Sequence, residues 1–403
     1  MAIPRWAALA MAGSMAAVLA GCGSSSGSGN NTTTTTASSK APIEIGMVSA
    51  LTGENALSGH LKVDGAQLAI NQINAQGGVD GRKLKLIVED DQSTNPGTVA
   101  AFEKLVNSYP DLVAVIGPIR STEMQAITPL VEQYKIPVLE GGTDPTITHE
   151  GDPWVFRFRP NDNYSGRTMA YYLTQVLHKK NIAIVHSTDA FGEGGDKALT
   201  QWLKTYGGNV VTDQGYTNGA TDYTAIVEAI KKANPDAVAT YFTFGPDLAI
   251  FLRQMNQLGV HTTILGSPSI TATDVVNLLH SSLDGDYGVT DYVMGQNPTA
   301  EAFGKAFQAT YNERPDNYSS YTWDAVRVLA HVLQPILKKG NLTATQIHQE
   351  VRQGMLSVRN FPAAEAPGQY NFDQNGDGLQ GYTVVQYQNG TLKILGAYDF
   401  YNK

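Results

Sequence analysis

From residue 43 onward, short apolar runs alternate with stretches in which apolar positions recur every three or four residues. Near-continuous apolar runs predict strands that are buried on both faces, and the stretches between them predict helices. The first strands are expected at 43–49, 84–89, 112–116 and 136–139, and the first helices at 58–74, 96–107 and 122–134. Gln125 follows Thr122 at the spacing of a capping box, which predicts the start of the third helix. The alternation predicts a parallel sheet covered by helices on both faces.

The same pattern restarts near residue 182. Strands are expected at 182–186, 210–215, 237–242, 262–265 and 287–292, with helices between them at 193–206, 222–233, 246–258 and 273–280. The C-terminal third predicts helices at 298–311, 319–337 and 344–352, then a hairpin of 382–388 and 392–398 turned by Asn389-Gly390. The fold class is therefore α/β, with two doubly wound parallel-sheet lobes in tandem.

Length and composition agree with two lobes. The chain has 403 residues, more than one compact core usually holds, and its 42% hydrophobic and 16% charged residues are typical of a globular protein. Open parallel sheets bind ligands beyond the carboxyl ends of their strands, so two facing lobes predict a small-molecule site in the cleft between them. The net charge of −9 and the lack of a basic block argue against nucleic acid as a partner.

The first 22 residues have the composition of a targeting segment. Arg5 precedes an apolar, small-residue stretch that ends at Cys22, the one cysteine of the chain. This resembles a bacterial lipoprotein signal, which implies cleavage before Cys22 and a lipid on its thiol; the alternative is a buried core cysteine. Residues 23–41 are rich in Gly, Ser and Thr and predict a flexible linker.

Several enzyme and metal motifs are missing from the sequence. It contains no HExxH, no GxxxxGK[ST] and no cluster of cysteine or histidine ligands, so we expect no cofactor, no metal and no enzyme activity. Residues 373–378 resemble the start of a calcium loop, but position twelve of that loop is Val384 rather than an acid. We therefore expect a sharp polar turn there.

Two loops carry the candidate chemistry. The loop 117–122 follows a predicted strand and opens a helix, where free backbone N–H groups can bind an anion, and Ser121 and Thr122 add hydroxyl donors. The next strand ends in Gly141-Gly142-Thr143, a second small, donor-rich loop. Together these loops could receive a carboxylate. The alternative is simple helix capping.

An ordered set of short stretches resembles the leucine/isoleucine/valine-binding protein family of periplasmic solute-binding proteins. The stretches are 45–46, 51–53, 73–79, 81–82, 89–91, 115–118, 142–145, 155–157, 191–192, 251–254 and 321–326. The resemblance implies two lobes joined by three crossovers near 159–163, 288–294 and 362–368. Lobe 1 would comprise 42–161 plus 290–364, and lobe 2 would comprise 162–289 plus 365–403.

The resemblance also implies a function. Members of the family bind a small solute between the lobes and hand it to an ABC-type permease, outside the cytoplasm. For this chain we expect a monomer anchored to the membrane by lipid on Cys22. The hinge would close on the ligand and shift the population toward the closed form. The alternative is a sensor that reports its ligand to a membrane receptor.

Site residues follow from the resemblance position by position. Ser121 and Thr122 match the ligand-carboxylate loop of the family, and Gly141-Gly142-Thr143 matches its second loop. Phe191 stands in place of the usual tyrosine that covers the ligand, and Phe244 lies near a second aromatic position. Ser267 lies where the family has an acid that meets the ammonium of an amino acid.

That departure suggests a particular ligand class, because a buried ammonium without a counter-charge is costly. Arg120 adds a cation beside the carboxylate loop, unless it is an exposed loop arginine. The hypothesis is a carboxylate that lacks an ammonium, such as an aromatic or aliphatic organic acid. The competing ligand is an ordinary amino acid whose ammonium meets Asp189 or Asp247.

Overall fold

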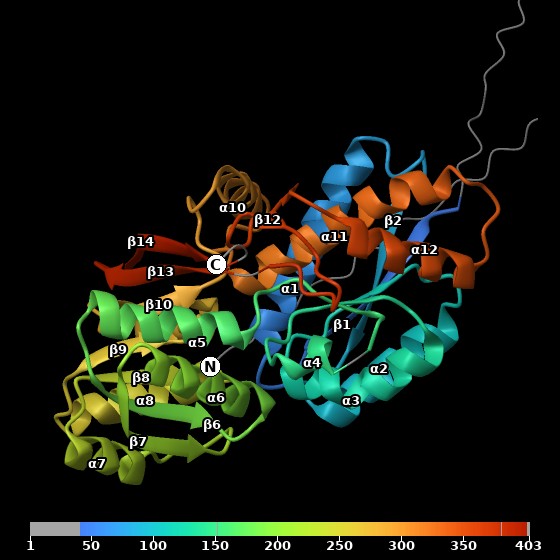
Figure 1. The fold of residues 1–403 in the computed structure, drawn as a ribbon. Coiled ribbons are helices and arrows are strands. Elements are labelled where there is room, and N and C mark those ends of the chain that lie inside the picture. Colours follow the sequence, from blue (N-terminus) through green and yellow to red (C-terminus); the bar gives the residue numbers. More distant parts are fainter. Residues whose placement is uncertain (1–40, 151, 380, 401–403) are drawn as a thin grey trace, which may run out of the picture. The chain divides into compact units, whose positions relative to one another are not determined.

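The computed structural model describes residues 41–150, 152–379 and 381–400. Five parallel strands form the first sheet in the order β2-β1-β3-β4-β5 (Figure 1). They are β1 (Ile43–Ser49), β2 (Leu84–Asp90), β3 (Val115–Ile116), β4 (Val138–Glu140) and β5 (Val155–Arg157). The helices between them are α1 (Ala56–Ala75), α2 (Asn95–Ser108), α3 (Ser121–Tyr134) and α4 (Thr146–His149).

The second sheet has seven strands in the order β14-β13-β10-β9-β8-β6-β7. Its parallel part comprises β6 (Asn181–Ser187), β7 (Asn209–Tyr216), β8 (Ala237–Tyr241), β9 (Thr263–Gly266) and β10 (Tyr287–Thr290). The antiparallel hairpin of β13 (Gly381–Gln388) and β14 (Thr391–Asp399) extends it beyond β10. The associated helices are α5 (Asp162–Tyr171), α6 (Ala190–Thr205), α7 (Thr224–Ala233), α8 (Gly245–Gln257) and α9 (Thr273–Leu279). The predicted α/β class is thereby confirmed.

Three late helices return to the first sheet. α11 (Asn317–Leu337) packs along α1, α12 (Ala344–Ser357) packs against α11, and α10 (Pro298–Tyr311) contacts α1 (Figure 1). A short ladder of β11 (Phe361–Pro362) and β12 (Gln369–Tyr370) precedes the last hairpin. The chain passes between the sheets after β5, after β10 and before β13, so we propose the lobe boundaries given above and call the two units lobe 1 and lobe 2.

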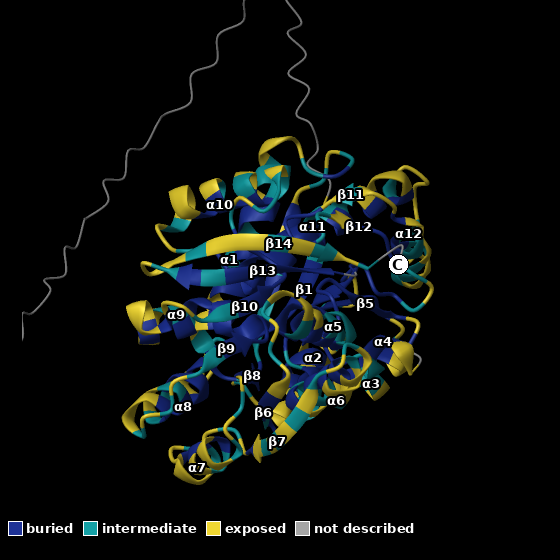
Figure 2. Cartoon of the chain, turned by 60° about the vertical axis from the view of Figure 1, so that its left-hand side comes forward, coloured by how far each residue is buried: buried dark blue, intermediate teal, exposed yellow. Residues whose placement is uncertain are grey.

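The inner strands of each lobe are largely buried, whereas the edge strands β7 and β14 are largely exposed or half-buried (Figure 2). In lobe 2 the rings of Tyr216, Phe242 and Phe251 stack in series, with centroids 4.4 Å and 5.2 Å apart. Such buried aromatic contacts stabilise a core beyond the area they bury. No helix in the described part of the chain is both long enough and apolar enough to cross a bilayer.

Most predicted elements form within a few residues of their expected bounds, and α10 has the expected bounds. The turn Asn389-Gly390 has positive φ at both residues, 52° and 70°, as a two-residue hairpin turn requires. The strand expected at 112–116 is shorter, because the ladder holds Val115 and Ile116 alone.

The capping box expected at Thr122 and Gln125 is wrong. The N-cap residue of α3 is Arg120, and the Glu123 carboxylate accepts a hydrogen bond from its backbone N–H at 3.2 Å. Gln125 instead donates to the Thr146 hydroxyl at 3.4 Å. The spacing of the motif was present, but the helix begins one residue earlier, so the acid at 123 takes the N3 position.

Candidate functional site

A cavity of about 40 Å³ lies between the lobes. Except for Tyr318 in α11, the residues that line it follow the carboxyl ends of parallel strands, where an open α/β sheet binds its ligand. Lobe 1 contributes Asn55, Ile119, Arg120, Ser121 and Thr143, and lobe 2 contributes Phe191, Thr243, Pro268 and Ser269. Arg159 and Tyr318 complete the wall. This lining contains two arginines and no carboxylate.

Ser121 begins α3 and is oriented as a donor. Its Oγ accepts hydrogen bonds from the backbone N–H groups of Thr143 at 3.2 Å and Asp144 at 3.1 Å. A hydroxyl has two lone pairs and one hydrogen, so the hydrogen remains for a third partner. Within the described residues, the N–H groups of Ser121 and Thr122 have no acceptor either. The start of α3 therefore offers donors to an acceptor in the cavity.

The second loop works differently from the expectation. Its three N–H groups are bonded within the protein: Gly141 donates to the Pro118 carbonyl, Gly142 to the Glu140 carboxylate, and Thr143 to Ser121. The expected free amide donors are thus absent from these three residues. The side chain of Thr143 lines the cavity instead and donates to the Asp162 carboxyl at 2.8 Å.

The glycine at position 141 permits this close approach of loops. A Cβ on Gly141 would lie 2.6 Å from Cδ1 of Ile119 and 2.9 Å from Cζ of Tyr321. Contacts that short force neighbouring atoms to move. Gly141 and Gly142 therefore shape the wall, and neither of them lines the cavity itself.

Arg120 is neither exposed nor free. Its Nε lies 2.8 Å and one amino nitrogen 2.5 Å from Oε1 of Glu123, and that nitrogen also donates to the Ser93 carbonyl. Its guanidinium carbon lies 5.3 Å from the ring centroid of Phe244 in lobe 2. The alternative of an exposed loop arginine is thus wrong, since the side chain is 13% exposed. Because Glu123 occupies the Nε edge of the guanidinium, a ligand carboxylate cannot bind that edge bidentately in this conformation. The second amino nitrogen of Arg120 remains available as a hydrogen-bond donor.

The predicted lobe-two residues lie around the same space. Phe191 lines the cavity and packs edge-on against Tyr241, with centroids 5.7 Å apart. Phe244 is buried beneath Arg120 and does not line the cavity. Ser267 is buried, and its Oγ lies 3.0 Å from Oγ of Ser269, which does line the cavity. This side of the wall therefore presents hydroxyls.

Neither alternative acid for an ammonium lines the cavity. Asp189 accepts four hydrogen bonds, from Ser187, Gly192, Asn218 and Thr243. Asp247 is buried, and its carboxylate accepts from the Gly219 N–H at 3.0 Å. Burial raises the pKa of Asp247 to about 6. The structure thus brings no unpaired carboxylate to the lining.

Arg159 lines the cavity although it was not among the predicted site residues. Its Nε lies 2.5 Å from Oδ2 of Asp291, one amino group donates to the Gly141 carbonyl at 3.2 Å, and its guanidinium carbon lies 5.6 Å from the Tyr318 ring centroid. Its pKa lies well above the usual value: burial opposes this, but the Asp291 charge outweighs it. The alternation Arg157-Phe158-Arg159 at the end of a strand was the available signal, because residues two apart in an extended chain share a face.

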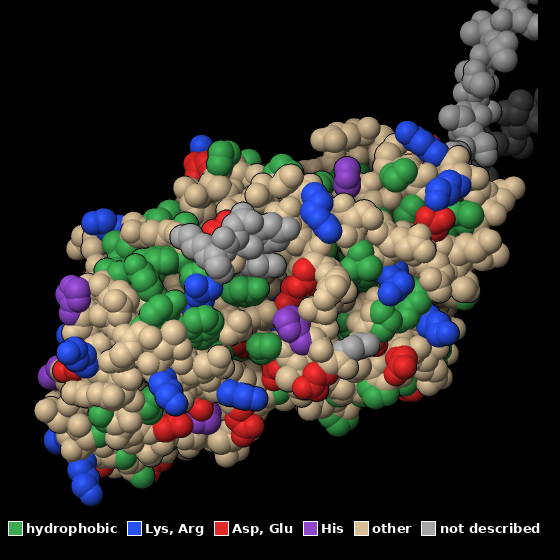
Figure 3. Space-filling model, viewed as in Figure 1, with side chains coloured by type: hydrophobic (Ala, Val, Ile, Leu, Met, Phe, Trp, Pro, Cys, Tyr) green, Lys and Arg blue, Asp and Glu red, His purple; other side chains and the backbone are tan. Residues whose placement is uncertain are grey.

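A larger groove of about 790 Å³ lies outside this cavity, between the two lobes. It is lined by residues of α3, α4, α5 and α6 and of the loops beside them, among them Thr122, Asp144, His149, Glu193 and Lys197. Acidic side chains gather over the region of α4 and α6 (Figure 3). Thr122 therefore lies at this outer groove rather than in the inner cavity.

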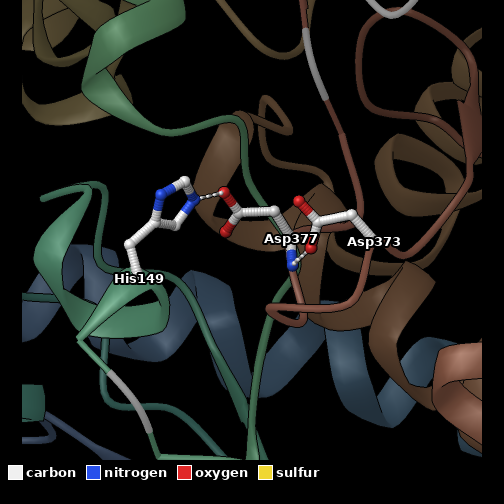
Figure 4. A group of neighbouring side chains, drawn as sticks. All are labelled: His149, Asp373 and Asp377. Atoms are coloured by element: carbon white, nitrogen blue, oxygen red, sulfur yellow. Dashed lines mark hydrogen bonds and ion pairs between the residues drawn. The ribbon is translucent and has the colours of Figure 1, made fainter.

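The resemblance of 373–378 to a calcium loop has a structural explanation. His149, Asp373 and Asp377 approach one another as a metal-binding group would (Figure 4). Asp377, however, accepts hydrogen bonds from Thr148, His149, Arg157 and Asn161 at 2.7–3.0 Å. Four donors use the lone pairs that an ion would need. The expected polar turn is confirmed, because Asp373 accepts from the N–H groups of residues 375 and 377.

Comparisons with known proteins agree with this architecture. A family model described as periplasmic binding protein matches residues 42–391. The leucine-specific-binding protein of Salmonella typhimurium is 29% identical over 289 residues, which cover 72% of this chain and 78% of the relative.

Solved structures show the same fold. A leucine-binding protein from Thermotoga maritima has a TM-score of 0.80 at 23% identity, covering 89% of this chain and 99% of the other. A solute-binding protein of an ABC transporter from R. palustris, solved in complex with benzoate, has a TM-score of 0.78 at 21% identity, covering 88% and 96%.

Proposed function

Because the chain belongs to the periplasmic binding protein family, we propose that it captures a small carboxylate between its lobes and delivers it to an ABC-type permease. It would act outside the cytoplasm as a non-enzymatic monomer. The signal ending at Cys22 lies outside the described residues, so the lipid anchor is part of the proposal.

The ligand we propose is a carboxylate without an ammonium. One observation carries this: the cavity is lined by Arg120, Arg159 and hydroxyl groups, and by no carboxylate. An ammonium buried against such a wall would lose its hydration without a counter-charge, at a cost of several kcal/mol. The carboxylate of the ligand, in contrast, would meet the Ser121 hydroxyl and the N-terminus of α3.

The relatives leave room for this ligand class. The Salmonella protein carries leucine in its name, and the R. palustris protein was solved with benzoate, a carboxylate that has no ammonium. Proteins of this fold therefore differ in what they hold. Phe191 would cover the apolar part of the ligand, and Phe244 would act through its contact with Arg120.

Calorimetric titration tests the proposal. The full chain in mild detergent, dialysed free of bound solute, would be titrated with isocaproate and with leucine, which share one carbon skeleton. We expect isocaproate to bind at least tenfold more tightly, because leucine must also bury its ammonium. Tighter binding of leucine would refute the ligand class while leaving the family assignment untouched.

A variant locates the carboxylate. Ser121→Ala removes a donor to a charged group, worth about 1.5–3 kcal/mol, so isocaproate should bind roughly tenfold to a hundredfold more weakly. Ser357→Ala is the matched control, since that hydroxyl donates to the Gln353 carbonyl on α12. Equal losses in both variants would show that Ser121 does not contact the ligand.

A further inference from the structure

Arg159 has more hydrogen-bond donors than the protein uses. A guanidinium carries five N–H groups. Three of them contact Asp291 at 2.5 and 3.4 Å and the Gly141 carbonyl at 3.2 Å. For the remaining two, one on each amino nitrogen, the described residues provide no acceptor. The residue is 5% exposed and lines the cavity, so these donors face a place that water or a ligand must fill.

The position of Arg159 is fixed from three sides. Asp291, itself fully buried, holds one edge of the guanidinium, the Gly141 carbonyl holds an amino group, and the ring of Tyr318 lies against the carbon at 5.6 Å. A planar donor held this way loses little freedom when it binds an acceptor. Arg159 follows β5, whereas the Ser121 hydroxyl is at the start of α3, and both residues line the same cavity.

The charges around the cavity decide what kind of acceptor fits. Arg120 is paired with Glu123, and Arg159 with Asp291. Near Arg120, Lys62 and Asp91 are both fully buried and opposite in sign. Each arginine of the lining thus already faces an anion, Lys62 does not line the cavity, and the start of α3 offers donors to one ligand carboxylate. A second negative charge would find no unmatched cation, whereas a neutral oxygen needs only N–H donors.

We propose that Arg159 forms a second acceptor-binding subsite, which selects carboxylates bearing a neutral oxygen acceptor, the α-keto acids above all. This rests on the proposed function, because it presumes a carboxylate at Ser121. The keto oxygen would accept hydrogen bonds from the two unused N–H groups of Arg159. An amino acid would place its ammonium, which is itself a donor, at the same point. Donor facing donor adds a reason for the site to reject amino acids.

Three matched sets of ligands test this by calorimetry on the full chain. Each set shares one skeleton and varies one group: propanoate, pyruvate and alanine; isocaproate, α-ketoisocaproate and leucine; phenylacetate, phenylglyoxylate and phenylglycine. In the set that fits the cavity, we expect the keto acid to bind at least tenfold more tightly than the plain acid, because it gains a hydrogen bond to a charged donor.

Variants then assign that preference to Arg159. Arg159→Met combined with Asp291→Asn removes both charges of the pair and avoids leaving one buried alone. We expect the ratio of keto acid affinity to plain acid affinity to fall to within about threefold of unity. Arg159→Lys keeps the charge opposite Asp291 but loses the planar set of guanidinium donors, so it should also reduce the preference for keto acids. This variant replaces the double variant if the latter is unstable. Arg167→Met, at a guanidinium over Trp202 in lobe 2, is the control and should change nothing.

The outcomes separate the two proposals. Equal binding of keto and plain acids, both tighter than the amino acid, would overturn the Arg159 subsite and leave the proposed function standing. A keto preference that survives in the double variant or in Arg159→Lys would also overturn the subsite. Amino acids binding most tightly in every set, or no binding in any set, would overturn the proposed ligand class and the subsite with it.

Discussion

Replacing Asp377 by Asn removes the charge that joins the loop 373–378 to lobe 1. Asp377 is buried and lies 2.9 Å from Nε of Arg157, itself fully buried. Breaking a buried pair by removing one partner typically costs about 3–5 kcal/mol, since the other charge stays behind. The native pKa of Asp377 is held at about 2, and the Arg157 charge is the main cause that lowers it against burial. That pKa lies below the 3.8 of the unfolded chain, so the stabilisation is present above pH 3.8 and is lost as the pH falls toward 2.

Glu140 should reduce the loss of stability that Asp377→Asn causes. Its Oε1 lies 3.6 Å from Nε of Arg157 and has no hydrogen-bond partner, and burial raises its pKa to about 8, so it is neutral at pH 7. Once Asp377 loses its charge, Arg157 favours ionisation of Glu140, which then takes over part of the pairing. Asp377→Asn alone should therefore cost about 2 kcal/mol, and Asp377→Asn with Glu140→Gln about 1–2 kcal/mol more than the sum of the single changes.

Urea unfolding of the wild type, both single variants and the double variant at pH 7 measures this coupling. Additive losses within about 0.5 kcal/mol would refute the exchange of partners between Asp377 and Glu140. The same samples, with and without a chelator, test the structural interpretation of the group in Figure 4. A midpoint lowered by the chelator and restored by calcium would show that His149, Asp373 and Asp377 hold a metal after all.

Three further outcomes can be checked on the same protein. Gly141→Ala should lower the unfolding free energy by about 1–3 kcal/mol in urea titrations, because its Cβ would lie 2.6 Å from Ile119; an unchanged midpoint would refute this close approach. Cys22→Ser should move the protein from the detergent to the aqueous phase on partition, and retention in detergent would contradict a lipid at this position. Burial raises the pKa of Asp162 to about 7, above the 3.8 of the unfolded chain, so its contribution to stability is lost as the pH rises from 3.8 through 7. Asp162→Asn, which keeps an acceptor for Thr143, should flatten the dependence of the melting temperature on pH in that range, and an unchanged slope would refute the assignment.

The strands, the helices and the position of the loop before α3 could be predicted because their signals are local. Each of these elements is indicated by a pattern of a few neighbouring residues: apolar runs, a strand followed by Gly-Pro, or hydroxyl side chains at the start of a helix. The amides of Gly142 and Thr143 could not be judged this way. Their acceptors, the Glu140 carboxyl group and the Ser121 hydroxyl, depend on how two loops meet in the folded lobe. The same holds for Arg120, whose Glu123 partner follows from where α3 begins.

Arg159 shows where such local reasoning ends. Its function depends on Asp291, distant in sequence and close in space, and on which of its donors that pairing leaves over. The arginines of the cavity wall are already paired with carboxylates of the protein. Their loss of hydration is therefore a cost of folding and is not repeated when a ligand binds. The ligand is then distinguished by what the wall lacks: it must supply acceptors and no more than one negative charge. Under this proposal, the paired arginines would select against amino acids through the unspent N–H groups of Arg159 rather than through net charge.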